Sequence, residues 1–338
     1  MNKKILTFCL LALLILGLCP QLLACDKEKD QGLDRVVFAL DWTPNTNHAG
    51  LFLARDRGYF RDQSIDLELR ETDMNFMEMV AGGSAACGMA GREQVLQARA
   101  AGASLPVLAI AAVLQENSSG FAAPLDRGIR QPEDFEEKRY SGWGTELELA
   151  MIRTLMEKRG ADFSKVKVIN QSAGNYIASM ELEADFAWIY YGWDGIICQQ
   201  EAYPIHFIPL RDIEPALDFY SPVIISNQSV LADNPDLVRR FLLACERGYR
   251  EAMADPEAAV DSLIKAAPGL DRDLLLASLD YLSPLFLGQA PYWGAMDPVV
   301  WTDFARWMDE EGLLDSTIQV EAAYETAFLP GELSKNGR

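Results

Sequence analysis

The sequence predicts an α/β fold with mixed, mainly parallel sheets and a helical C-terminal part. Apolar runs typical of strands alternate with segments of helical periodicity from Val36 to Ser226. Such alternation is the pattern of a mainly parallel sheet covered by helices. From Pro235 onward the periodicity is mostly helical. The 338 residues are enough for about two domains.

The first third of the chain contains four expected strands and three expected helices. The strands cover residues 36–40, 65–69, 85–90 and 105–114, and the helices begin near residues 49, 76 and 93. Pro44 stops the first strand, and Gly58 suits the left-handed geometry at the end of the first helix.

A second unit is expected to begin near Ala123-Pro124. Its helices cover residues 147–158 and 176–182, its strands cover 166–169, 186–191 and 206–208, and a short helix begins at 192. Ser221 to Ser226 is interpreted as a strand that crosses back. In the helical part that follows, Trp301, Phe304, Ala305 and Met308 are spaced as on one helix face.

Residues 1–24 are interpreted as a secretory signal peptide. Lys3 and Lys4 precede a short apolar run from Ile5 to Leu18. Leu22 to Cys25 resembles a bacterial lipobox, in which Cys25 becomes the lipidated first residue. We therefore expect export and a lipid anchor on the outer face of the cytoplasmic membrane, on the periplasmic side in a Gram-negative cell. An uncleaved membrane anchor is the alternative.

The composition restricts the partners and cofactors. Removing residues 1–24, which hold two lysines and no acidic residue, leaves 28 basic and 50 acidic residues and a net charge of −22. This charge argues against nucleic acid as a partner and is compatible with a neutral or cationic ligand. Cys87, Cys198 and Cys245 are expected to be buried free thiols, and a disulfide between two of them in an exported protein is the alternative. With His48 and His206 as the two histidines, no metal-ligand spacing emerges.

The segment Asp41 to Phe60 is the most informative in the chain. It places a polar turn between the end of a strand and the beginning of a helix. Open α/β sheets bind ligands at such places, because free helix amides and polar side chains point outward there. The candidate ligand-binding residues are Asp41, Trp42, Asn45 and His48, and the indole of Trp42 offers a flat face to a ring. An ordinary strand–helix connection with a packed Trp is the alternative.

Two further polar segments follow apolar strands. Asn117 and Ser118 come directly after the strand that ends near Leu114, so they are candidates for the same edge of the sheet. A solvated turn is the alternative. Glu93 opens a helix, where helix capping is a sufficient structural reason for it, and we treat it as a further candidate.

Two later segments supply the remaining candidates. Glu148 follows the Gly142-Trp143-Gly144 turn, where a carboxylate could accept hydrogen bonds from a ring amino group or compensate the helix dipole. The aromatic-rich segment from residue 185 to 195 supplies Tyr191, Trp193 and Asp194. Their alternative role is packing between domains. Tyr220, directly before the returning strand, is the last candidate.

These segments resemble the thiamine-pyrimidine family. D-W-x-P-N-x-x-H-x-G followed by A-x-x-x-G-Y-F is similar to its first motif, and residues 185–195 resemble D-x-x-W-I-x-x-x-W-[ED]-G. Residues 142–148 resemble G-W-G-S-P-x-E, with Glu146 where Pro is usual. The family includes bacterial solute-binding proteins for formylaminopyrimidine or hydroxymethylpyrimidine precursors, and the yeast-type enzyme that makes the pyrimidine phosphate. The resemblance extends to about Leu329.

The resemblance implies a two-lobed fold of the type II periplasmic-binding-protein kind. Residues 25–34 would be a tether, 35–122 and 221–330 the first lobe, 123–220 the second lobe, and 331–338 a tail. The crossovers near 121–124 and 219–222 would act as hinges. The implied ligand is a thiamine pyrimidine precursor held between the lobes. The implied partners are an ABC permease and its ATPase.

The yeast-type relatives make an enzyme the alternative. Their chemistry consumes a histidine, which His48 matches, and needs pyridoxal phosphate on a lysine and a cysteine-rich iron motif. No lysine occurs between Lys29 and Lys138, and the chain has no run of cysteines. Since aldehyde capture needs an amine, we expect a binder without a cofactor rather than an enzyme. A binder of sulfonate, nitrate or riboflavin is a further alternative.

Overall fold

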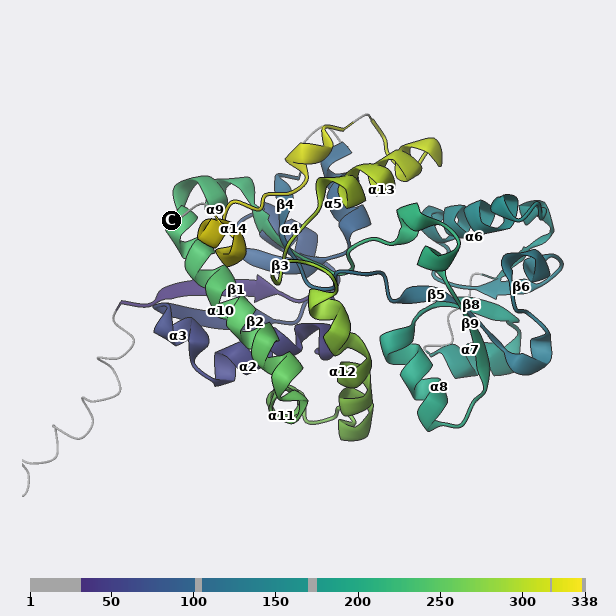
Figure 1. Cartoon of the computed structure of the whole chain (residues 1–338), viewed down its shortest axis with the longest axis horizontal. Coiled ribbons are helices and arrows are strands. Elements are labelled where there is room, and N and C mark those ends of the chain that lie inside the picture. Colours follow the sequence, from purple (N-terminus) through teal and green to yellow (C-terminus); the bar gives the residue numbers. More distant parts are fainter. Residues whose placement is uncertain (1–31, 101–104, 170–174, 317, 336–338) are drawn as a thin grey trace, which may run out of the picture.

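The structure, a computed structural model, describes residues 32–100, 105–169, 175–316 and 318–335. The predicted signal peptide and the predicted lipidation site, Cys25, lie outside the described residues. Two lobes lie side by side along the longest axis, each built on its own sheet (Figure 1).

The first sheet has the strand order β2-β1-β3-β10-β4. Its strands are β1 (Asp34–Ala39), β2 (Ile65–Arg70), β3 (Cys87–Ala90), β4 (Val107–Ala112) and β10 (Val223–Asn227). β1 pairs in parallel with β2 and β3, whereas β10 runs antiparallel to β3 and β4. Four of the five strands therefore point the same way.

The second sheet repeats this pattern in the order β7-β6-β8-β5-β9. Its strands are β5 (Ser119–Pro124), β6 (Arg139–Ser141), β7 (Lys167–Ile169), β8 (Phe186–Tyr190) and β9 (Ile205–Pro209). β5 is the strand that runs against its neighbours β8 and β9. In both lobes the reversed strand is thus the one that the chain forms directly after crossing over. The predicted lobe change at residue 123 falls inside β5, and the change at 221 falls between β9 and β10.

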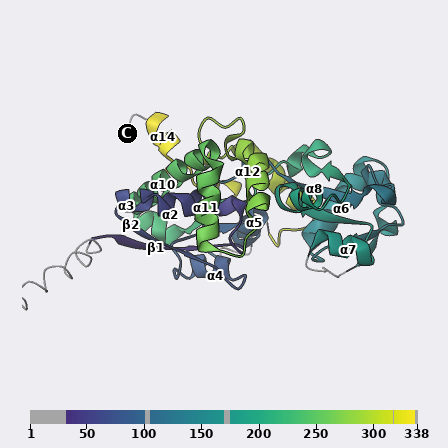
Figure 2. The same ribbon diagram turned by 90° about the horizontal axis from the view of Figure 1, so that it is seen from below.

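Helices cover both faces of the first sheet, because its strands bury side chains on both sides. In β1, Val36 and Phe38 pack into one apolar cluster and Ala39 packs into another on the opposite face. One face carries α2 (Ala49–Asp56), α3 (Tyr59–Asp62), α10 (Pro235–Ala254) and α11 (Pro256–Ala266). The other carries α4 (Phe76–Ala81) and α5 (Arg92–Ala100), and α9 (Gln228–Asp233) follows β10; Figure 2 shows α4 on the side away from α10 and α11.

The second sheet is covered in the same manner. α6 (Glu146–Lys158) packs on one face, and α7 (Tyr176–Leu182) and α8 (Ile196–Gln200) pack on the other. The predicted strands and helices are present within a few residues. β5 and β6 were not predicted, because β5 begins within the polar segment 115–120 and the short sequence Arg-Tyr-Ser of β6 carries no apolar run.

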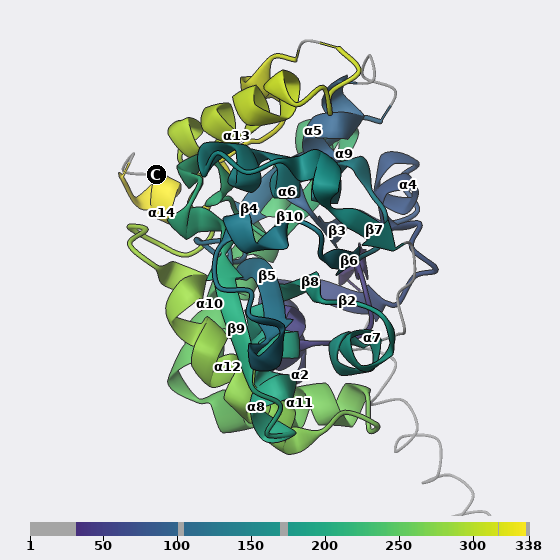
Figure 3. The ribbon, with the colours of Figure 1, turned by 90° about the vertical axis from the view of Figure 1, so that its right-hand side faces the viewer.

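Two C-terminal helices of the first lobe contact the second lobe through their side chains. On one side α12 (Arg272–Leu287) packs on the second lobe, where the rings of Tyr281 and Tyr191 lie 5.0 Å apart. On the other side α13 (Pro298–Glu310) reaches α6, and Trp307 Nε1 donates a hydrogen bond to Thr154 Oγ1 over 2.9 Å. Figure 3 shows α12 and α13 on opposite sides of the second lobe; α14 (Pro330–Lys335) ends the described chain.

The predicted apolar face of α13 is buried. Its residues Trp301, Phe304, Ala305 and Met308 belong to an apolar cluster that also contains Phe121, Phe135 and Phe186 of the second lobe. One apolar core therefore runs through the region where the chain crosses between the lobes. Among the described residues, no helix combines the length and the apolarity needed to span a bilayer.

Candidate functional site

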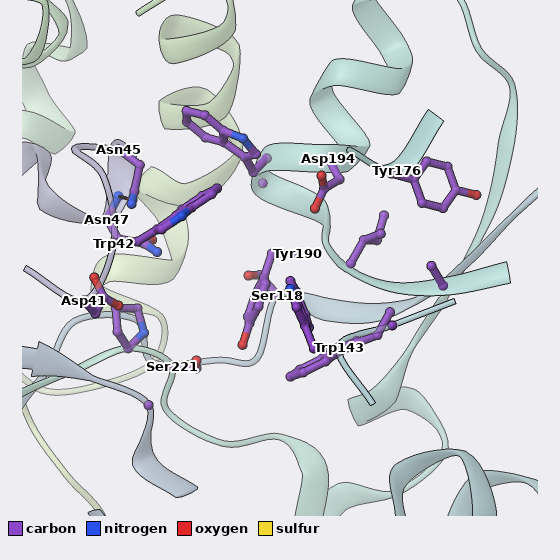
Figure 4. Close-up of a pocket in the computed structure, with 18 of the residues that line it drawn as sticks. Asp41, Trp42, Asn45, Asn47, Ser118, Trp143, Tyr176, Tyr190, Asp194 and Ser221 are labelled. Atoms are coloured by element: carbon purple, nitrogen blue, oxygen red, sulfur yellow. Dashed lines mark hydrogen bonds between the residues drawn. The ribbon is translucent and has the colours of Figure 1, made fainter. Parts of the chain in front are cut away.

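A cavity of about 600 Å³ lies between the two sheets. Figure 4 shows Asp41, Trp42, Asn45 and Asn47 on one side of it and Trp143, Tyr176 and Asp194 on the opposite side, with Ser118, Tyr190 and Ser221 between them. Both lobes thus contribute to its walls. A volume of this size suits a small organic molecule.

The turn after β1 forms the first wall. Asn45 caps the one-turn helix η1 (Thr46–His48), because its side-chain oxygen accepts the backbone N–H of Asn47 over 2.9 Å. The turn leaves Trp42 52% exposed at the mouth of the cavity. Its ring meets that of Trp193 edge to face, with centroids 6.2 Å apart. Trp42 and Trp193 therefore connect the two lobes at the cavity.

The end of β8 forms the facing wall. Trp188 and Tyr190 lie on the same face of β8 and both line the cavity, since side chains two residues apart share a strand face. A turn of π-helix (Tyr191–Gly195) follows and brings Trp193 and Asp194 to the cavity. Trp143, from the segment before α6, is 65% exposed beside Trp188, with ring centroids 5.9 Å apart.

Three carboxylates from different elements line the cavity: Asp41, Glu93 and Asp194. Burial raises the pKa of Glu93, and it raises the pKa of Asp194 from its ordinary value of 3.8 to about 6. Among the described residues that line the cavity, none is Lys, Arg or His. The site can therefore accept N–H donors and positive charge, and it offers no fixed cation to an anion.

The charge of Arg92 opposes the effect of burial on the pKa of Glu93, but the guanidinium packs elsewhere. It is fully buried and lies over the rings of Phe219 and Phe304, with its central carbon 5.3 and 4.1 Å from their centroids. Its Nη1 donates to the carbonyl of Val300 over 3.1 Å. Burial lowers the pKa of Arg92 to about 9. Arg92 thus belongs to the packing of α13 rather than to the cavity wall.

Seven of the twelve predicted ligand-binding residues line the cavity, and they come from both lobes. They are Asp41, Trp42, Asn45, Glu93, Ser118, Trp193 and Asp194. The other five, His48, Asn117, Glu148, Tyr191 and Tyr220, do not line it.

Glu148 is turned inward as a capping residue of α6. Its carboxylate accepts hydrogen bonds from Tyr140 Oη over 2.7 Å, from the Trp143 N–H over 2.9 Å, and from Thr145. It also lies where a side chain at Gly142 would stand, because its Oε2 is 2.0 Å from the position of a Cβ there. The glycine therefore admits the carboxylate, and Glu148 shapes the turn that presents Trp143.

The remaining four are also engaged away from the cavity. Asn117 donates from Nδ2 to the Leu217 carbonyl over 2.7 Å and stabilises the crossover. Tyr220 Oη accepts the Asp297 N–H over 2.8 Å. Strand β8 ends at Tyr190 rather than at Tyr191, and the π-helical turn directs Tyr191 to Phe207 and Tyr281, with centroids 4.8 and 5.0 Å away. His48 is buried behind Asp41.

Several cavity residues were missed from the sequence. They are Asn47, Trp143, Asn175, Tyr176, Trp188 and Tyr190. The period-two spacing of Trp188 and Tyr190, next to Asp194, was the available signal for one face of β8. For Asn175, which caps α7, the position before a helix was the signal.

No group of three or more His, Cys, Asp or Glu among the described residues is arranged to hold a metal ion. Cys87, Cys198 and Cys245 are buried free thiols. Burial raises the pKa of Cys87 and that of Cys198 to about 12. None of these thiols lines the cavity.

Comparisons with known proteins agree on one protein family. The family described as NMT1/THI5 like matches residues 45–259. A formylaminopyrimidine-binding protein of Halalkalibacterium halodurans is 24% identical over 328 residues, which cover 94% of this chain and 96% of that protein. The 4-amino-5-hydroxymethyl-2-methylpyrimidine phosphate synthase THI5 of Saccharomyces cerevisiae is 25% identical over 264 residues, which cover 71% of this chain and 74% of the synthase.

The fold also matches solved structures. The periplasmic aliphatic sulphonate binding protein SsuA of Escherichia coli superposes with a TM-score of 0.69 at 12% identity, covering 86% of this chain and 91% of that chain. This likeness confirms the predicted two-lobed fold of periplasmic binding proteins.

Proposed function

The chain belongs to the NMT1/THI5-like family, and from this premise we propose that it is the extracytoplasmic solute-binding component of an ABC importer. Its ligand in this proposal is a thiamine pyrimidine precursor, formylaminopyrimidine or hydroxymethylpyrimidine. The relative from Halalkalibacterium halodurans, whose name states that it binds formylaminopyrimidine, matches nearly the whole chain.

The observation that carries the proposal is the composition of the cavity wall. The rings of Trp42, Trp143, Trp188 and Trp193 all line a space for a small molecule, Trp42 meeting Trp193 and Trp143 meeting Trp188 edge to face. Stacking on a flat heterocycle contributes about 0.5–1.5 kcal/mol beyond the buried area. Hydrogen bonds to a charged acceptor contribute about 1.5–3 kcal/mol each. An aminopyrimidine has a flat ring and an amino group, and it can use both kinds of contact.

The same wall argues against an anionic ligand. A sulfonate or nitrate needs N–H donors or a cation, whereas the carboxylates of Asp41, Glu93 and Asp194 would repel it. The likeness to the sulphonate-binding protein at 12% identity concerns the fold alone.

The protein is a binder rather than an enzyme of the synthase type. Covalent capture of an aldehyde cofactor needs an amine, and no lysine is among the described residues that line the cavity. His48 is 0% exposed and is hydrogen-bonded at both ring nitrogens. A side chain in this position is not presented to a cofactor in the cavity.

The transport cycle follows from the two lobes. The ligand enters between the indoles of Trp42 and Trp143, the lobes close around it, and the permease recognises the closed form. Cys25, in the part of the chain outside the described residues, would carry the lipid that keeps the protein at the membrane. The crossovers on either side of the second lobe would act as hinges.

A thermal-shift screen tests the proposal. The compounds are formylaminopyrimidine, hydroxymethylpyrimidine, thiamine, riboflavin, taurine and nitrate. A bound pyrimidine at 100 times its dissociation constant is expected to stabilise the protein by about 2.7 kcal/mol. If only taurine or nitrate raises the melting temperature, the chain is an anion binder and the proposal is wrong.

A further inference from the structure

His48 is hydrogen-bonded at both ring nitrogens, although neither faces the cavity. The backbone N–H of Asn45 donates to Nδ1 over 3.2 Å, as part of the capping box of η1. Nε2 lies 2.9 Å from Oδ1 of Asp41. The ring itself is 0% exposed, so water does not compete for these contacts.

These two contacts determine where the ring carries its proton. Nδ1 accepts a backbone N–H, so it holds a lone pair and no hydrogen. The proton is therefore on Nε2, which donates it to Asp41. In this tautomer the imidazole is neutral, and it does not cancel the charge of the carboxylate that it holds.

The position of Asp41 gives this contact a consequence for the ligand. Asp41 lines the cavity with its side chain 24% exposed, whereas His48 stands behind it. One oxygen, Oδ1, is engaged by His48, and no hydrogen bond within the described protein engages Oδ2. A ligand N–H group would therefore meet a carboxylate whose orientation is fixed and whose charge is intact.

We propose that His48 is a positioning residue for the ligand: as a neutral imidazole it fixes the Asp41 carboxylate so that Asp41 accepts a hydrogen bond from an N–H group of the bound heterocycle. This inference rests on the proposed function for the identity of the heterocycle. It assigns His48 an indirect role in affinity and leaves direct contact to Asp41.

The competing explanation is that His48 only caps η1 and packs beneath it. Two substitutions separate the two roles. His48→Gln places an amide N–H near the former Nε2, so it keeps a donor for Asp41. His48→Asn places an amide oxygen near the former Nδ1, so it keeps the acceptor for Asn45 and loses the contact with Asp41. Both substitutions remove the buried imidazole ring, so they share the loss of its packing.

The affinity for hydroxymethylpyrimidine is measured by calorimetry for both variants, with thermal unfolding as the check on folding. We expect His48→Asn to weaken binding at least about 10-fold, the effect of disturbing a charged acceptor. His48→Gln is expected to stay within about 3-fold of the natural protein. A loss in His48→Gln that equals or exceeds the loss in His48→Asn would show a packing or capping role and overturn the proposal.

A double-mutant cycle adds a test that a purely structural residue would fail. If His48 acts through Asp41, then His48→Asn should weaken binding little further once Asp41→Asn is present. Additive losses would overturn the proposal.

Nitrogen-15 NMR of the ligand-free protein tests the tautomer without any ligand, and the assignment is simple because the chain has two histidines. A proton on Nε2 alone is expected for His48. A proton on Nδ1, or on both nitrogens, overturns the proposal even if pyrimidines bind. If the tautomer is as expected and no pyrimidine binds, the proposed ligand is wrong while the Asp41–His48 arrangement stands.

Discussion

Two indoles beside the cavity are more than half exposed to water, and this is unusual for so large an aromatic side chain. Trp42 is 52% and Trp143 is 65% exposed, and they come from different lobes. Exposed aromatic rings beside a cavity are available to a ligand rather than to the core. Their energetic contribution should therefore appear in binding and not in folding.

Trp42→Ala and Trp143→Ala are each expected to weaken binding of hydroxymethylpyrimidine by about 0.5–1.5 kcal/mol or more, the contribution of a lost aromatic contact. The ligand-free melting temperature should change little, because exposed substitutions usually stay within about 0.5 kcal/mol. Calorimetry and thermal unfolding check the two statements. Leu182→Ala, at a side chain 73% exposed away from the cavity, is the control. Unchanged affinity in both Trp variants would contradict this assignment.

Asp194 is expected to make the ligand-free protein less stable at neutral pH. Burial raises the pKa of its carboxyl from 3.8 to about 6. The folded state then binds this proton more tightly than the unfolded state, so the free energy of unfolding rises as the pH falls from about 6 to about 4. Asp194→Asn should stabilise the protein near neutral pH by an amount on the order of 3 kcal/mol at most, and should matter little near pH 4. Denaturant unfolding across this range measures the effect.

Ligand binding should show the opposite pH dependence. A protonated Asp194 no longer offers a charged acceptor, so the dissociation constant is expected to rise as the pH falls through about 6. Asp194→Asn should bind more weakly and lose this dependence. Asp233→Asn, at an exposed carboxylate remote from the cavity, should keep the natural profile. A natural protein with flat affinity between about pH 5 and 7 would exclude Asp194 as a ligand contact.

Sequence reasoning predicted several residues of the cavity wall from their positions after strand ends. It found Asp41, Trp42 and Asp194, because the carboxyl ends of strands meet at one edge of a sheet. It misplaced Glu148 and Asn117, because their partners decide their direction. Glu148 turns toward Tyr140 and Asn117 toward Leu217, and neither partner is evident from the local pattern.

At the scale of the elements, the closest helix packing depends on two glycines. A Cβ at Gly50 in α2 would stand 2.4 Å from the ring of Tyr249 in α10, and one at Gly248 would stand 2.1 Å from the Gly50 carbonyl. Both glycines allow α2 and α10 to approach each other closely. Because α2 follows the turn that carries Asp41 and Trp42, this packing also supports the cavity wall.

Gly50→Ala is expected to destabilise the protein by about 1–3 kcal/mol, since overpacking displaces neighbouring atoms. Gly269→Ala is the matched control, because a Cβ there meets nothing within 4 Å. It should be neutral or stabilising by up to about 1 kcal/mol. Chemical denaturation compares the two. A Gly50→Ala variant as stable as the natural protein would mean that α2 and α10 separate without loss.

The elements were predictable because their apolar runs and helical spacings are clear, as in β4, a continuous apolar run in which all six residues are buried. The division of strands between sheets was not predictable from periodicity. β10 pairs with β3 and β4 of the first lobe, although the whole second lobe lies between β4 and β10 in the sequence. Such long-range pairing leaves no local pattern, and here the family resemblance supplied the two-lobed arrangement.

At the scale of the whole molecule, the two lobes share an apolar core. The cluster that contains Trp301 and Phe304 of α13 also contains Phe121 and Phe186 of the second lobe. Side chains of one buried cluster lose their contacts together, so the lobes should not unfold independently.

We expect a single cooperative thermal transition. In scanning calorimetry the calorimetric enthalpy should equal the van't Hoff enthalpy. Two resolved transitions would show that the shared core does not couple the lobes. Ligand should move the single transition to higher temperature without splitting it.

The central position of β10 has a consequence for the nascent chain on the ribosome. β3 and β4 lie on either side of it and do not pair with each other, so an N-terminal fragment that stops before residue 223 has a gap in the middle of its sheet. Until the ribosome has delivered that strand, the first lobe stays incomplete. The second sheet, whose strands all lie between Ser119 and Pro209, has every strand available before that point, so we expect the lobe that begins the chain to be the last to become compact.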